Sequence, residues 1–199
     1  LTHILKLSDE ELPFLTGTIC AHRCQTKCTR NYYDDPVQIR ATKLIAAEKG
    51  YDDLMASLKK PEPVTDGRKA AIIGGGPTGI AAAYFLGRAG IPVTVFEQSH
   101  KLGGVPRLVI PGFRISEEAI EKDIALMTFY GAEVKLNTPA PSVSELKAMG
   151  YTHIFFAVGA GKAGQLDIPG NVVPVIQWLR DLKACLLYTS PSPRDTERS

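Results

Sequence analysis

Three glycines and one acid in this chain stand at the spacing of a dinucleotide site. Gly74, Gly76 and Gly79 follow the apolar run "AAII", and Glu97 closes the next apolar run, "PVTVFE". In a strand–turn–helix unit such glycines allow a tight turn, a close approach of pyrophosphate and close helix packing. An acid about 20 residues further on accepts hydrogen bonds from a ribose. The pattern predicts a site for NAD or FAD, and the alternative is a tight turn with an empty site.

A second group of residues could bind metal. Cys20, Cys24 and Cys28 place three thiols within nine residues, and His22 lies among them. Without a recognisable secretory leader, an odd number of thiols favours metal ligation over disulfide bonds. Zinc sites and iron–sulfur clusters both use thiolates, but His22 is awkwardly placed to share one ion with its neighbours. Zinc, an iron–sulfur cluster and three cysteines without metal therefore remain open.

The glycine-rich stretch lies in a segment that alternates strand and helix patterns. Strands are expected at 70–74, 92–97, 132–138 and 152–160, and helices at 77–90, 115–131, 142–150 and 173–184. Alternation of this kind predicts a mainly parallel sheet with helices on both faces, which is an α/β fold.

A small helical region is expected before this α/β unit. Pro36 is placed to open a helix that ends at Gly50, with Val37, Ile39, Leu44 and Ile45 along one side. Residues 51–58 add a turn or two, and the proline- and charge-rich residues 59–68 form a linker. The expected organisation is therefore a helical region at 1–58, a linker at 59–68 and an α/β domain at 69–184.

Composition excludes several classes of protein. The 199 residues are 44% hydrophobic and 22% charged with a net charge of +2, which is typical of a soluble globular protein. No block of five like charges suggests nucleic-acid binding, and no run of 18 apolar residues suggests a membrane span. Hydrolase and nucleotidase motifs are absent from the sequence. We expect a cytoplasmic protein.

Residues beyond Glu97 make the chain resemble a known family. Gly103-Gly104, the run Ile110-Pro111-Gly112-Phe113-Arg114 and the strand end Ala157-Val158-Gly159-Ala160 follow in order. This order is similar to the flavin domain of the glutamate synthase small-subunit family of FAD and iron–sulfur oxidoreductases, which includes the N-terminal half of dihydropyrimidine dehydrogenase. The resemblance covers roughly residues 14–184. It is strongest, through "CTRNYYDDPVQIR", to a flavin subunit of the selenate-reductase type.

The resemblance implies that the first glycine-rich unit holds FAD. The implied cofactor-binding residues are Gly74, Gly76, Pro77, Thr78 and Gly79 at the pyrophosphate, Glu97 with its neighbour Gln98 at the ribose, Gly104, Val105 and Arg114 on the flavin side, Ala140 near the adenine, and Gly159 through its backbone. The alternative for Arg114 is a surface ion pair.

The resemblance also implies [4Fe–4S] clusters, with Cys20, Cys24 and Cys28 at ligand positions. Where relatives supply a further Glu or Gln ligand, this sequence has Lys43, which is a poor iron ligand when protonated. In relatives a second glycine-rich unit, placed after the segment that ends here near Ala184, binds NAD(P)H.

The expected protein is thus an incomplete Rossmann-like FAD-binding unit preceded by a small α-helical iron–sulfur region. It would be part of an oxidoreductase that passes electrons from NAD(P)H to an acceptor on another domain or subunit, and it would be inactive alone. The alternatives are an NAD-binding dehydrogenase and a non-catalytic, flavin-binding scaffold subunit.

The last residues break the pattern. "CLLYTSPSPRD" resembles a translated sequencing adapter, so Cys185–Ser199 is expected to lie outside the natural protein. The alternative is a flexible tail rich in serine and proline.

Overall fold

The computed structural model describes residues 12–161, 164, 168–170 and 172–186. The elements in chain order are α2 (Pro13–Ile19), α3 (Arg23–Thr26), the short 3-10 helix η1 (Thr29–Tyr32), α4 (Ile39–Ser57), β1 (Ala70–Ile73), α5 (Pro77–Arg88), β2 (Val93–Phe96), α6 (Gly104–Leu108), α7 (Glu117–Phe129), β3 (Glu133–Lys135), α8 (Val143–Ala148), β4 (His153–Phe156) and α9 (Val175–Leu186). The expected alternation of strands and helices beyond the linker is confirmed.

The four strands form one parallel sheet in the order β3-β2-β1-β4. The chain runs outward from β1 through β2 to β3 and then returns to place β4 on the other side of β1. In open parallel sheets, ligands bind beyond the carboxyl ends of the strands where the strand order reverses. The topology therefore places a candidate site at the ends of β1 and β4.

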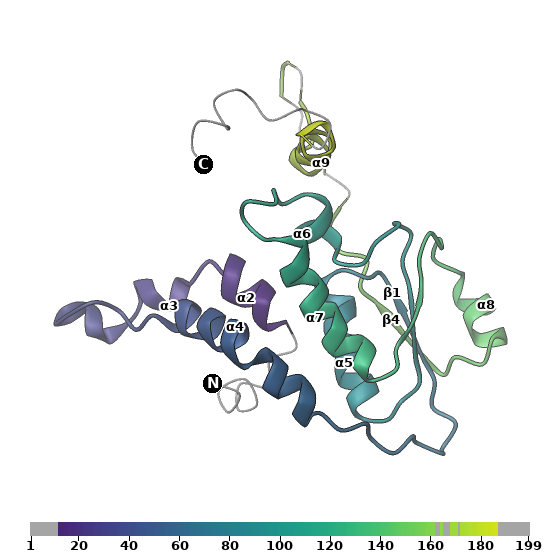
Figure 1. Ribbon diagram of the computed structural model, residues 1–199. Coiled ribbons are helices and arrows are strands. Elements are labelled where there is room, and N and C mark those ends of the chain that lie inside the picture. The colour runs from purple at the N-terminus through teal and green to yellow at the C-terminus, as the bar shows by residue number, and fades with distance from the viewer. Residues whose placement is uncertain (1–11, 162–163, 165–167, 171, 187–199) are drawn as a thin grey trace.

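Helices cover both faces of the sheet (Figure 1). Helices α5 and α7 lie on one face and α8 lies on the other. Because side chains alternate along a strand, Ile72 and Val95 pack toward α5 and α7, whereas Ile73 and Phe96 pack with Leu146 of α8. The α/β class expected from the sequence is confirmed.

The N-terminal helices pack directly against the α/β unit. Helix α2 contacts both α4 and α7, and the buried residues Phe14 and Tyr51 belong to the same apolar cluster as Ile72. The carboxylate of Asp123, on α7, accepts hydrogen bonds from the backbone N–H groups of Phe14 at 3.0 Å and Leu15 at 2.7 Å. The helical region is therefore held on the α/β unit by a shared core and by buried hydrogen bonds.

Two expectations for α4 are wrong. The helix begins at Ile39, not near Pro36, and it continues through Gly50 to Ser57. Asp34 instead pairs with Arg30 at 2.6 Å in the preceding turn. Gly50 is buried and does not end the helix, because Tyr51 and Leu54 beyond it also bury their side chains.

The expected apolar side of α4 is wrong for three of its four residues. Val37, Ile39 and Ile45 are 50%, 46% and 47% exposed, whereas Leu44 is partly buried against the core. The buried side carries Ala46, Ala47, Gly50, Tyr51 and Leu54. Small residues let α2 approach α4 closely: a Cβ atom added at Gly17 would lie 3.0 Å from the Cα of Leu44. Close backbone packing, not the largest aliphatic side chains, determines the buried face.

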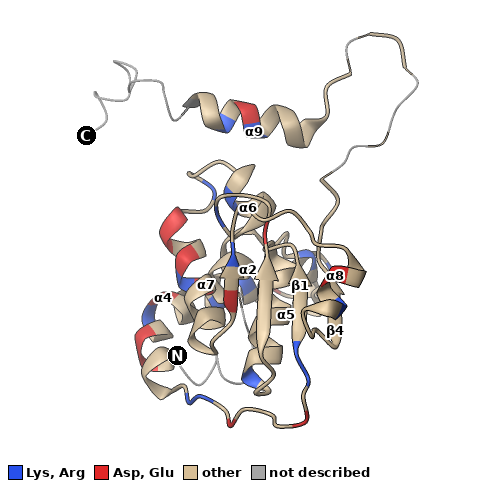
Figure 2. Cartoon of the chain, turned by 90° about the vertical axis from the view of Figure 1, so that its right-hand side faces the viewer, with Lys and Arg blue, Asp and Glu red and all other residues tan. Residues whose placement is uncertain are grey.

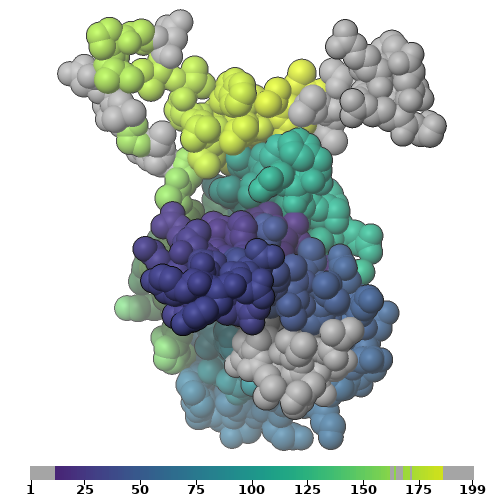
Figure 3. Space-filling model, turned by 90° about the vertical axis from the view of Figure 1, so that its left-hand side faces the viewer, coloured from purple at the N-terminus to yellow at the C-terminus, as the bar shows by residue number. Residues whose placement is uncertain are grey.

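The last helix, α9, lies against α6 (Figure 3). The side chain of Trp178, on α9, is 53% exposed. Cys185 and Leu186, at the start of the expected tail, still belong to α9, and residues 187–199 lie outside the described part of the chain. Of the helices that the structure describes, none is both long and apolar enough to cross a bilayer.

Candidate dinucleotide site

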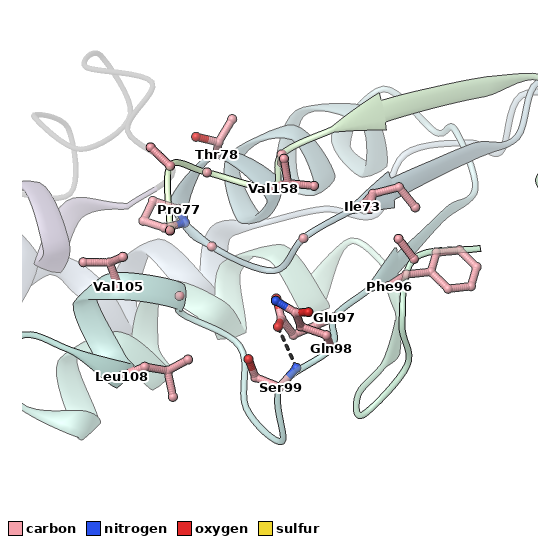
Figure 4. A pocket seen from close by; sticks show the side chains of 18 of the residues that line it. Ile73, Pro77, Thr78, Phe96, Glu97, Gln98, Ser99, Val105, Leu108 and Val158 are labelled. Carbon is pink, nitrogen blue, oxygen red and sulfur yellow. Dashed lines mark hydrogen bonds between the residues drawn. The ribbon is translucent and has the colours of Figure 1, made fainter. Parts of the chain in front are cut away.

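A cavity of about 430 Å³ lies beyond the carboxyl ends of β1, β2 and β4 (Figure 4). Its walls are the turn after β1, the loop after β2, the first turn of α6 and the segment after β4. The lining includes Ile73, Gly74, Gly76, Pro77, Thr78, Phe96, Glu97, Gln98, Ser99, Gly104, Val105, Leu108, Thr138, Ala140, Val158, Gly159 and Arg180. This is the place where the strand order predicts a ligand.

Two glycines of the fingerprint have different surroundings. A Cβ atom added at Gly79 would lie 1.9 Å from the backbone oxygen of Gly74, so this position requires glycine for α5 to pack on the turn. A Cβ atom added at Gly76 would have no neighbour closer than the Cα of Gly104, at 3.9 Å. Gly76 therefore borders open space in the cavity, where a phosphate group could approach the backbone.

The N-terminus of α5 points its free amide groups toward this space. Gly76 is the N-cap and Pro77 is the first helical residue, so the N–H of Thr78 is the first one available. Figure 4 shows Pro77 and Thr78 on one side of the cavity and Glu97 and Gln98 across it. Helix N-termini carry a partial positive charge and bind phosphates through their unpaired N–H groups.

Glu97 joins the two loops that form the cavity. Glu97 is only 7% exposed. Its carboxylate accepts a hydrogen bond from the N–H of Gly75 at 2.6 Å and from the N–H of Ser99 at 2.7 Å. Each carboxylate oxygen can accept more than one hydrogen bond, so further lone pairs are available to ribose hydroxyls. Glu97 therefore both shapes the site and can bind the sugar.

The second glycine pair brings α6 against the turn that follows β1. The N–H of Gly103 donates to the backbone oxygen of Gly75 at 2.8 Å. Gly104 has a φ of +55°, and a Cβ atom there would lie 2.8 Å from the Cα of Gly76. A side chain at Gly104 is thus excluded both by conformation and by space. The cavity continues past this contact along Val105 and Leu108.

A buried arginine supports the same loop. Arg107 is 3% exposed, donates to the backbone oxygen of Leu102 at 3.0 Å and pairs with Glu117 at 3.3 Å and with Glu121. These contacts join α6 to α7 below the loop that carries Gly103. No sequence motif points to Arg107, because its partners Glu117 and Glu121 lie on another helix and only the fold brings them together.

Most of the residues that the resemblance assigns to the cofactor come together here. Those that line the cavity are Gly74, Gly76, Pro77, Thr78, Glu97, Gln98, Gly104, Val105, Ala140 and Gly159. Gly79 lies behind the turn, against Gly74. Arg114 is exposed and lines a separate depression with Phe14 and Glu48, away from the cavity. No sequence signal points to Ser99 and Thr138, which reach the cavity from loops, to Leu108 of α6 or to Arg180 of α9.

The cysteine group does not form a metal site in the described part of the chain. Cys20 and Cys24 are exposed and Cys28 is half-buried, and no three His, Cys, Asp or Glu side chains there are placed to hold one ion. Backbone hydrogen bonds from Val37 and Arg30 lower the pKa of the Cys28 thiol. His22 has a φ of 40°, and its buried Nδ1 atom has no hydrogen-bond partner. The described residues alone therefore do not form a complete set of cluster ligands.

Comparison with known proteins agrees with the fold. The family described as NAD(P)-binding Rossmann-like domain matches residues 72–117, which run from β1 through the glycine fingerprint and Glu97 to the start of α7. This match and the parallel sheet confirm the Rossmann-like fold expected from the sequence.

Three curated relatives match most of this chain. The YgfK protein of Escherichia coli (strain K12) is 39% identical over 174 residues, which cover 85% of this chain and 17% of that protein. The glutamate synthase (NADPH) small chain of Mycobacterium tuberculosis is 32% identical over 161 residues, covering 80% and 33%. The NADPH-Fe(3+) oxidoreductase subunit beta of Geobacter sulfurreducens is 31% identical over 165 residues, covering 80% and 24%. The chain thus spans a third or less of the length of each relative.

Proposed function

We propose that this chain, which belongs to the oxidoreductase family of the glutamate synthase small chain, is the FAD-binding part of a longer NAD(P)H-dependent enzyme. The enzyme would take a hydride from NAD(P)H and pass electrons to an acceptor on another domain or subunit. The observation that carries the proposal is the cavity itself, in which Gly76, the N-terminus of α5 and Glu97 stand where a dinucleotide would need them.

Charge and chemistry of the lining favour a cofactor that does the redox chemistry itself. Glu97 is the only acid among the described lining residues, and its carboxylate already binds two backbone N–H groups. No His, Lys or Cys lines the cavity in the described part of the chain. FAD, when bound, supplies the hydride acceptor and can release electrons singly. The protein's part is then to bind and orient the cofactor.

Each wall has a role in that binding. The N–H groups at the start of α5 would hold the pyrophosphate, and Glu97 would bind the ribose. Val105 and Leu108 extend an apolar wall past Gly104, which suits a planar ring system. This extension favours FAD over NAD(P). The match to an NAD(P)-binding family supports the second candidate, in which the same cavity holds a nicotinamide dinucleotide.

Partners and further cofactors follow from the relatives. Two of them carry NADPH in their names, and their names describe them as a small chain and as a subunit, so we propose partner subunits and an NAD(P)H site outside residues 12–186. Cys20, Cys24 and Cys28 are the candidate ligands for a [4Fe–4S] cluster in the longer protein. Because the described residues form no ligand set, we derive no electron-transfer step through a cluster.

The proposal is tested by mixing the FAD-loaded chain with NADPH in the absence of oxygen and recording the flavin absorbance. The expected result is a flavin that stays oxidised, because hydride transfer needs a nicotinamide site that we place in another part of the enzyme. A longer version of the protein should bleach the flavin under the same conditions. Rapid bleaching by the present chain alone would contradict this division of the enzyme.

A further inference from the structure

We propose that Arg180, on α9, binds the pyrophosphate of the dinucleotide and that α9 thereby closes the open side of the cavity. This inference rests on the proposed function, because it assigns a further binding residue to the same site. No sequence motif points to Arg180, which lies far along the chain from the glycine fingerprint.

Arg180 can balance the phosphate charges of a dinucleotide in the cavity. Among the described residues that line the cavity, Arg180 is the only cationic side chain and Glu97 is the only anionic one. A dinucleotide brings two phosphate charges, and the N-terminus of α5 offers only a partial positive charge. A full positive charge at the cavity would offset the remaining phosphate charge, and among the described lining residues Arg180 can supply it.

The guanidinium of Arg180 has hydrogen-bond donors available for a ligand. It also lines an adjoining cavity of about 470 Å³, which shares Gln98, Ser99 and Leu108 with the first. The other cations of that second cavity are engaged: Lys101 with Glu117 at 3.2 Å, Arg107 with Glu117 and Glu121, and Lys183 with backbone oxygens. Arg180 makes no hydrogen bond or ion pair with any residue that the structure describes. Its planar guanidinium matches the geometry of a phosphate.

The position of α9 directs Arg180 toward the cavity. Lys183 donates from Nζ to the backbone oxygen of Ile110 at 2.7 Å and to that of Arg107, so it holds α9 on the end of α6. Arg180 and Lys183 are three residues apart and so lie on the same side of the helix. Figure 3 shows α9 resting on the α6 segment, and Figure 2 shows it lying above the α/β unit as a separate layer. The contact of Lys183 thus aims Arg180 at the cavity.

The test compares the binding of FAD, ADP and adenosine to the wild-type chain and three variants by calorimetric titration. Arg180→Gln removes the charge, Arg180→Lys keeps the charge without the planar fork, and Asp181→Asn is the matched control. Asp181 is exposed on α9, pairs with Gln177 at 2.8 Å and lines neither cavity. Circular dichroism verifies that all variants retain their helices.

We expect Arg180→Gln to weaken the binding of FAD and ADP by about 10- to 100-fold, because the variant lacks the hydrogen-bonded charge pair with the phosphates. Arg180→Lys should weaken them less, and adenosine binding and the Asp181→Asn variant should be unchanged. Wild-type affinity for ADP in Arg180→Gln would overturn the inference, as would an equal loss for adenosine, which has no phosphate. If the wild-type chain binds neither FAD nor ADP, the proposed function is itself wrong and the inference falls with it.

Discussion

At the scale of the residue, Gly76 and Gly79 have separable roles that a single methyl group can distinguish. Gly79→Ala places a Cβ atom 1.9 Å from the backbone oxygen of Gly74, whereas Gly76→Ala meets no protein atom closer than 3.9 Å. We expect Gly79→Ala to destabilise the fold by roughly 1–3 kcal/mol. Gly76→Ala should leave the melting temperature unchanged. It should weaken FAD binding about tenfold, because the added methyl group occupies the space proposed for the phosphate.

Thermal denaturation and FAD titration of the two glycine variants provide the measurement, and each variant is the control for the other. A large loss of stability in Gly76→Ala would show that the space beside it is not free for ligand. Full FAD affinity in that variant would show that the pyrophosphate lies elsewhere.

Glu97 allows a second prediction at this scale. In wild-type Glu97, one carboxylate oxygen accepts from the N–H of Gly75 and the other from the N–H of Ser99. Glu97→Gln replaces one of these oxygens with an NH₂ group, which is a donor, so one of the two backbone N–H groups loses its acceptor. We expect a loss of about 1–3 kcal/mol in stability, since an unsatisfied buried donor costs that much, and weaker FAD binding. Urea denaturation with and without FAD measures both. Glu118→Gln, on the exposed side of α7, is the control and should behave like the wild type.

At the scale of the element, the attachment of α2 depends on one carboxylate. Asp123 accepts from the N–H groups of Phe14 and Leu15, in the first turn of α2, where a negative charge also interacts favourably with the helix dipole. Asp123→Ala leaves these buried donors unpaired, so we expect it to destabilise the packing of α2 and α4 by about 2 kcal/mol or more.

Hydrogen exchange measures this effect element by element. Amides of α2 and α4 should exchange faster in Asp123→Ala. Those of β1 and β2 should keep their protection, because the strands also pack on the opposite face of the sheet, where Ile73 and Phe96 form a separate cluster with Leu146. Equal loss of protection in the sheet would show that the helical region and the α/β unit unfold only together.

The elements also show what a sequence can predict. Apolar runs and their alternation located β1, β2, α5 and α7, and Ser116 caps α7 by accepting from the N–H of Ala119. These are local signals. The buried side of α4 was not predictable, because it depends on contact with Gly17 of another helix. Glu97 was found by its spacing, whereas Arg107 and Arg180 were not, because folding alone brings them to the site.

At the scale of the whole molecule, the free energy of unfolding at high pH should depend on the contact between Tyr51, in the helical region, and α7. Burial, with smaller effects from Asp123 and Asp52, raises the pKa of Tyr51 to about 12, and its hydroxyl donates to the backbone oxygen of Lys122 at 2.8 Å. An unfolded tyrosine ionises near pH 10. The stability that the neutral Tyr51 hydroxyl contributes to the folded state is therefore complete below about pH 10 and is lost as the pH rises through about 12.

Tyr51→Phe should accordingly lose about 1 kcal/mol at neutral pH and show a shallower fall in stability between about pH 10 and 12. Urea denaturation at a series of pH values gives the comparison. Tyr33→Phe is the control, because Tyr33 is 91% exposed. If the stability of Tyr51→Phe falls as steeply between about pH 10 and 12 as that of the wild type, other groups cause the alkaline loss of stability.

Equilibrium titration of the purified chain with FAD, NADH and NADPH tests whether the cavity at the ends of β1, β2 and β4 is a flavin site. We expect FAD to bind one to one, to remain with the protein through gel filtration and to be displaced by ADP. NADH and NADPH should bind far more weakly. Tight binding of a nicotinamide dinucleotide together with no retention of FAD would refute the flavin site and establish the second candidate function.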